Sequence, residues 1–115
     1  MPAPPRLGNL LAAAAARPGT ERFEVLYESQ GARVERIVSS GSQPPASFDQ
    51  DHDEWVLLVR GEAVVEVDGV ELDLRAGDHL TLPAHTPHTV VSTSEGAVWL
   101  AVHAPACLPS PLAPT

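Results

Sequence analysis

The chain has 115 residues, the size of a single domain, and is long enough to bury a hydrophobic core without disulfides or a structural metal. Its composition, 43% hydrophobic and 19% charged, is that of a globular protein. Seven basic residues, all of them Arg, stand against 15 acidic ones, and the formal net charge of −8 opposes binding to nucleic acid. No window approaches the ~20 apolar residues of a membrane span, so we expect no membrane partner either.

The first 20 residues are rich in Pro and Ala and form the first of three zones. Residues 10–16 read LLAAAAA and are followed by Pro18 and Gly19, which predicts a short helix that starts near Asn9. The same run is a weaker match to a secretory signal, because it is short and only weakly apolar. We therefore expect residues 1–20 to form a helical or irregular arm.

The last zone, residues 105–115, contains four Pro and no charged residue. This composition predicts a loose tail or an arm packed on a neighbour. Cys107, the single Cys, has no partner for an internal disulfide or for a zinc motif, which indicates a reducing cytoplasm. The folded domain is expected between these zones, over residues 21–104.

The middle zone is read as a series of short β-strands separated by turns. An Asp68-Gly69 pair stands between two alternating segments and predicts a tight hairpin, since such a turn requires positive φ. The gaps between strands are too short for the helices of an α/β fold. The predicted class is therefore an all-β antiparallel sandwich or barrel, with strands over residues 23–28, 32–38, 55–59, 63–67, 70–74, 79–82, 89–93 and 97–103.

Four of the five His residues fall close to acidic or amide side chains in this zone. Gln50, His52 and Glu54 share one strand parity, and His88 begins a strand that could lie beside them. In a small barrel, side chains of one parity converge on the interior. Imidazole and carboxylate groups together make a ligand set for Fe, Mn, Ni or Zn.

Two spacings make the chain similar to a known family. Glu54 is followed by six residues and then Gly61; Gly77 is followed by five residues and then Pro83, with His88 five residues beyond. From about residue 41 to 103 the chain resembles the cupin superfamily, and this resemblance implies an antiparallel β-barrel or jelly roll.

A subgroup of small bacterial cupins of unassigned activity is more similar still. Its members typically carry an E-R-I-V-S stretch, a D-Q segment, E-W-V, P-A-H-T-x-H and W-L-A-V-H. The corresponding segments here are residues 35–39, 49–50, 54–56, 83–88 and 99–103.

The chain departs from metal-binding cupins at the first motif, where the two usual His positions hold Phe48 and Gln50. The resemblance carries over Glu54 and His88 as the primary metal ligands. His85 replaces a usual glycine and His103 ends the last strand, so the hypothesis is that nitrogen ligands stand at these new positions. The predicted metal site therefore comprises Glu54, His88, His85, Gln50 and His103. Alternatively, Glu54 and His88 form a buried hydrogen-bonded pair, and His85 and His103 only orient their neighbours.

These residues lead to two hypotheses for function. The first is an interior pocket that binds a divalent transition metal (Fe, Mn, Ni or Zn) and a small-molecule ligand, and the resemblance would make its activity that of an oxygenase or isomerase. The second is a metal-free module that binds or senses a small molecule in the same pocket. The sequence leaves open whether the chain is an enzyme. A homodimer is expected, because cupins commonly pair and sheet edges need covering. His52 is expected to be a solvated loop residue, and Trp55 and Trp99 are expected in the core or an interface.

Overall fold

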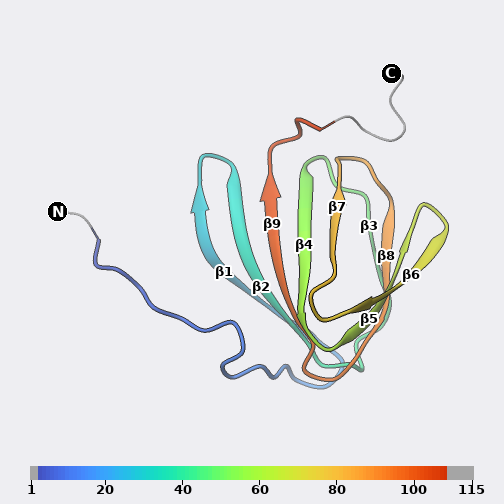
Figure 1. Ribbon diagram of the computed structural model, residues 1–115, viewed down its shortest axis with the longest axis horizontal. Coiled ribbons are helices and arrows are strands. Elements are labelled where there is room, and N and C mark those ends of the chain that lie inside the picture. Colours follow the sequence, from blue (N-terminus) through green and yellow to red (C-terminus); the bar gives the residue numbers. More distant parts are fainter. Residues whose placement is uncertain (1–2, 109–115) are drawn as a thin grey trace.

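The computed structural model describes residues 3–108, which fold into two antiparallel β-sheets that face one another (Figure 1). The first sheet has the strand order β1-β2-β9-β4-β7 and the second has the order β3-β8-β5-β6. The strands are β1 (Glu21–Ser29), β2 (Ala32–Ser39), β3 (Ala46–Phe48), β4 (Asp53–Arg60), β5 (Glu62–Val67), β6 (Val70–Arg75), β7 (His79–Leu82), β8 (His88–Thr93) and β9 (Val98–Ala104).

The all-β antiparallel prediction is confirmed in its sandwich form, and the structure adds one strand that was not predicted. Across residues 3–108 strand pairing stays within each sheet, so the architecture is a two-sheet sandwich and not one barrel closed by hydrogen bonds. The short strand β3 was not predicted, because three residues after a Pro-rich break carry too little periodicity to be recognised. β3 pairs with β8 and thereby brings Phe48 opposite His88.

The predicted Asp68-Gly69 hairpin is confirmed. Both residues have positive φ, 50° and 81°, as a type I′ turn requires, and the turn joins β5 to β6 with Val67 opposite Val70.

The hydrophobic core fills the end of the sandwich where β4 passes into β5. Leu58 and Ala97 are fully buried there, and Ala63 and Leu74 are nearly so. Toward the opposite end the interior becomes polar. Glu54 lies near the start of β4, His88 at the start of β8 and His103 near the end of β9. The antiparallel order therefore gathers three predicted site residues at one end of the molecule.

The predicted N-terminal helix is wrong. Residues 10–13 form a turn, and Ala13 has a φ of 49°, which no right-handed helix contains. The buried Arg36 of β2 donates hydrogen bonds from Nη1 to the backbone oxygens of Leu10 (2.9 Å) and Ala12 (2.6 Å). A run of seven residues gains little from isolated helix formation because nucleation is costly. Capture of its carbonyl groups by an arginine of the sheet therefore decides its conformation.

The start of the predicted tail is held by a buried carboxylate. Asp53, 6% exposed, accepts hydrogen bonds from the backbone N–H groups of Ala84 at 2.9 Å, Cys107 at 2.9 Å and Leu108 at 3.1 Å. These bonds, that of Cys107 first, hold the pKa of Asp53 below its usual value. The remainder of the tail prediction, residues 109–115, lies outside the described residues.

We expect Asp53→Asn to lower stability at neutral pH and to weaken its acid dependence. The folded-state pKa of Asp53 is lowered, so its contribution is fully present above the unfolded pKa near 3.8 and is lost as pH falls through the lower folded value. Urea unfolding of both proteins between pH 7 and pH 3 measures this. Two parallel stability curves would contradict the assignment.

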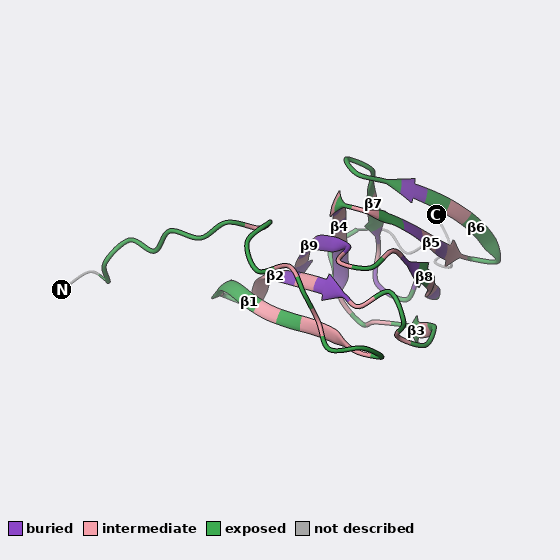
Figure 2. Ribbon diagram, turned by 90° about the horizontal axis from the view of Figure 1, so that it is seen from below, coloured by how far each residue is buried: buried purple, intermediate pink, exposed green. Residues whose placement is uncertain are grey.

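Large apolar side chains remain exposed on the edge strand β1. Phe23, Val25 and Tyr27 are 54%, 56% and 58% exposed, and Figure 2 shows the exposed stretches of this strand and of the N-terminal arm. The homodimer stays a prediction, with β1 as the edge at which we expect it; light scattering measures it. Within residues 3–108 no helical segment has the length and apolar character needed to cross a membrane.

Candidate functional site

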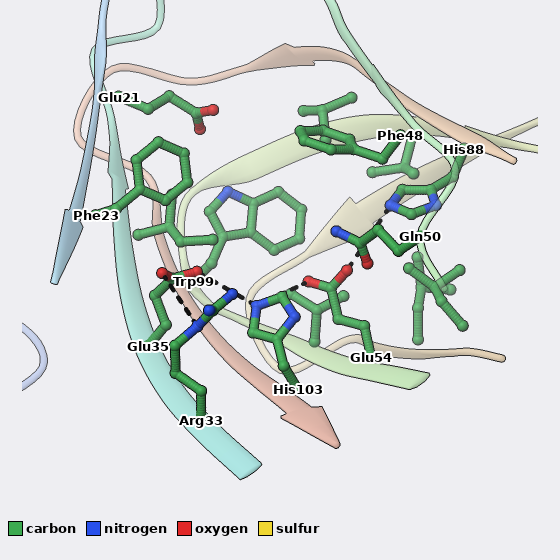
Figure 3. A pocket seen from close by; sticks show the side chains of 16 residues that line it. Glu21, Phe23, Arg33, Glu35, Phe48, Gln50, Glu54, His88, Trp99 and His103 are labelled. Atoms are coloured by element: carbon green, nitrogen blue, oxygen red, sulfur yellow. Dashed lines mark hydrogen bonds and ion pairs between the residues drawn. The ribbon is translucent and has the colours of Figure 1, made fainter. Parts of the chain in front are cut away.

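A cavity of about 240 Å³ lies between the two sheets. Its wall is largely apolar, and three aromatic side chains, Phe23 of β1, Phe48 of β3 and Trp99 of β9, surround it (Figure 3). The polar residues of its lining are Glu21, Arg33, Glu35, Gln50, Glu54, His88 and His103. Four of the five predicted site residues, Gln50, Glu54, His88 and His103, therefore line one cavity.

Glu54 is the central carboxylate of the site. It lies directly opposite His103 in the β4–β9 pairing, so the two side chains share the interior face of the sheet. Its Oε1 is 3.8 Å from His88 Nε2 and its Oε2 is 4.0 Å from His103 Nε2. Both distances exceed a hydrogen bond. Among residues 3–108 no hydrogen bond reaches its carboxylate, although the residue is only 8% exposed.

His88 is oriented by the backbone beside it. Its Nδ1 lies 2.9 Å from the backbone oxygen of Thr86, and because a carbonyl oxygen can only accept, Nδ1 carries the proton and donates it. In the neutral imidazole, Nε2 is then an acceptor that faces Glu54. The ring of Phe48 stacks on the imidazole with a centroid distance of 5.4 Å and an interplanar angle of 23°. This stacking covers one side of the His88 ring with Phe48, the residue that stands at the position of a motif histidine.

His103 has protein partners at both ring nitrogens. Its Nδ1 is 2.9 Å from Nε2 of His52, and its Nε2 is 3.3 Å from Oε1 of Glu35 on β2. His52 was expected to be solvated, yet its side chain is only 30% exposed and contacts His103. Glu35 and Arg33 were missed, because the pairing of β2 with β9 cannot be read from local patterns. The one available signal was charged residues alternating with apolar ones along β2.

Gln50 and His85 are joined by a backbone hydrogen bond, but the Gln50 side chain faces the cavity and the His85 side chain faces solvent. The backbone N–H of His85 donates to the backbone oxygen of Gln50 at 2.6 Å, and Gln50 lines the cavity. The His85 side chain is 62% exposed, with Nδ1 3.4 Å from Oδ1 of Asp49. His85 has a φ of 61°, a conformation that glycine adopts readily, which accounts for the glycine usual at this position in the motif. The structure therefore does not bring His85 to the other four residues.

The predicted metal-ligating side chains, in the arrangement that the structure gives them, do not fit a metal ion. Among residues 3–108 no three His, Cys, Asp or Glu side chains are grouped so that they could hold one. Two physical reasons are visible: a phenyl ring stands at residue 48, and both nitrogens of His103 already have partners. Glu54 and His88 remain as two potential metal ligands that face one another.

Comparison with known proteins decides the family. The family profile described as "Cupin domain" matches residues 34–103. The chain belongs to the cupin family. A comparison of this cupin with curated proteins gave no match.

Solved structures similar to this cupin include one with high sequence identity. A protein from Ralstonia eutropha JMP134, named as a proposed mannose-6-phosphate isomerase, is 41% identical with a TM-score of 0.81, and the match covers 89% of this chain and 100% of that one. An RmlC-like cupin from Shewanella frigidimarina NCIMB 400 is 25% identical with a TM-score of 0.68, over 80% and 82% of the two chains. KdgF from a Halomonas species, 20% identical with a TM-score of 0.68 over 79% and 84%, is similar in fold.

Proposed function

We propose that this cupin binds a small, partly apolar organic molecule in its interior cavity and needs no resident metal to do so. The observation that carries the proposal is Glu54, a nearly buried carboxylate that faces the cavity without a hydrogen bond from residues 3–108. Burial of an ionised carboxylate is costly unless donors reach it. A ligand with a hydrogen-bond donor would supply what the protein does not.

A metal-dependent function is the second candidate, and the orientation of His88 favours it. Histidine ligands commonly donate their second N–H to a backbone carbonyl, as Nδ1 of His88 does to Thr86. Glu54 and His88 would be the ligands, and a bound ion would act as a Lewis acid. Against this candidate stand Phe48 in the place of a motif histidine and the engaged nitrogens of His103.

The name of the Ralstonia relative suggests a phosphosugar as substrate. The charges of the cavity oppose that ligand, because three carboxylates and only one guanidinium line it. A sugar carries hydroxyl groups all round its ring, and those that face the apolar part of the wall would lack partners. We therefore favour a small molecule with a single polar end.

One experiment separates the two candidates. Protein purified without a His-tag is divided into a chelator-treated portion and portions loaded with Zn²⁺, Mn²⁺, Ni²⁺ or Fe²⁺, and metal content is measured by elemental analysis. Each portion is then screened by thermal shift with a library of small molecules. We expect the same molecules to stabilise the chelator-treated and loaded protein equally, since binding to the folded state alone raises the melting temperature. Stabilisation seen only with a stoichiometric metal would replace our proposal by the second candidate.

A further inference from the structure

We propose, resting on the ligand pocket above, that the bound molecule is an organic ammonium ion: a protonated amine attached to a small apolar group. The proposal depends on three features of the cavity, namely its charge, the geometry of two facing acceptors and its aromatic wall.

The first feature is the excess of negative charge in the cavity, and Glu54 is the carboxylate whose charge is least compensated. Glu21 has a partner in Ser39, whose hydroxyl donates to it at 2.7 Å. Glu35 has two cationic or polar neighbours, Arg33 Nε at 3.8 Å and His103 Nε2 at 3.3 Å. Glu54 is left with no guanidinium, and its side chain is 9% exposed. An anionic ligand would be repelled here, whereas a cation would neutralise the carboxylate in surroundings of low dielectric constant.

The second feature is a pair of acceptors that face one another. Nδ1 of His88 donates to the Thr86 carbonyl, so when the imidazole is neutral its Nε2 presents a lone pair toward Oε1 of Glu54, 3.8 Å away. One nitrogen atom placed between them can lie about 2.9 Å from both, which is hydrogen-bond distance. A primary ammonium group carries three N–H donors and can therefore bridge the pair, with one donor remaining. A hydroxyl group has a single donor and would satisfy only one of the two acceptors.

The third feature is the aromatic wall. The rings of Phe23, Phe48 and Trp99 surround the same space (Figure 3). Aromatic faces attract cations and also accept the apolar group that carries the amine. The cavity of about 240 Å³ is small beside the ~300–1,000 Å³ typical of drug-sized ligands, so the apolar group must be compact.

Matched probes of equal shape test the charge of the ligand. Three amines, butylamine, cyclohexylamine and benzylamine, are each compared with the alcohol and the carboxylate of the same carbon skeleton, by calorimetric titration of chelator-treated protein. We expect at least one amine to bind about tenfold or more tightly than its alcohol, with its carboxylate weakest. An alcohol or carboxylate that binds as tightly as its amine would overturn the ammonium proposal and leave the pocket proposal standing. If none of the nine probes and no library molecule binds, both proposals fail.

Two substitutions locate the preference at one side chain. Glu54→Gln keeps the size of the side chain and removes its charge, so we expect the amine to lose its advantage while the alcohol keeps its affinity. Glu71→Gln, at an exposed position of β6 outside the cavity, removes one charge elsewhere and should change neither. An undiminished amine preference in folded Glu54→Gln would overturn the proposal. The probes in the unmodified protein decide the charge preference even if this variant does not fold.

Discussion

Gly41→Ala is expected to destabilise the protein by about 4 kcal/mol, because it combines backbone strain with a steric clash between the new Cβ and the backbone of a neighbouring loop. Gly41 has a φ of +86°, in the left-handed region. A Cβ built there would lie 2.7 Å from the backbone nitrogen of Glu95 and 2.8 Å from its Cα. Both are backbone atoms of the β8–β9 loop, which cannot rotate away. That loop is bound to the end of β2 by the N–H of Gly96, which donates to the backbone oxygen of Ser39.

Gly69→Ala is the matched control. Gly69 has a similar φ of +81°, but no atom lies within 4 Å of the position that a Cβ would occupy. Only the strain of a left-handed alanine remains, about 1 kcal/mol. Urea unfolding of the three proteins at one pH measures both changes. Similar losses for the two variants would show that close approach to Glu95 has no part in the requirement for glycine at residue 41.

The paired substitution Phe48→His and Gln50→His is expected to tighten Zn²⁺ binding at least about a hundredfold, which corresponds to about 2.7 kcal/mol or more. Phe48 stacks directly on His88, and Gln50 lines the cavity with Glu54. Two imidazoles at these positions would join His88 and Glu54 in a set of four nitrogen and oxygen donors, which suits Zn²⁺. The unmodified protein offers only the facing pair of His88 and Glu54.

Competition with a chromophoric chelator measures the Zn²⁺ affinity. The variant with Ala at residues 48 and 50 opens the same space without adding donors, so it should bind no more tightly than the unmodified protein. A folded double-His variant with unchanged affinity would mean that Phe48 is not what prevents a metal site here. That result would also remove one of the two arguments for a metal-free pocket.

Local patterns in the sequence were enough to predict most strands and the turn at Asp68-Gly69, and the motif spacings grouped Glu54 with His88, which line one cavity. The reason is that alternation of apolar and polar residues, positive-φ turn residues and motif spacing are properties of neighbouring residues along the chain. Gln50 and His103 were also predicted to line the site, and both line the cavity.

Only the tertiary structure decided which distant side chains complete the site. His103 meets His52 and Glu35 because β9 lies between β2 and β4, an order that no local pattern specifies. His85 stays outside because its left-handed backbone turns its side chain toward solvent. The arm is a turn and not a helix because Arg36, far along the chain, binds its carbonyl groups. Each outcome depends on a contact between residues remote in sequence, and the free energy of such contacts exceeds the weak local preferences from which a sequence is read.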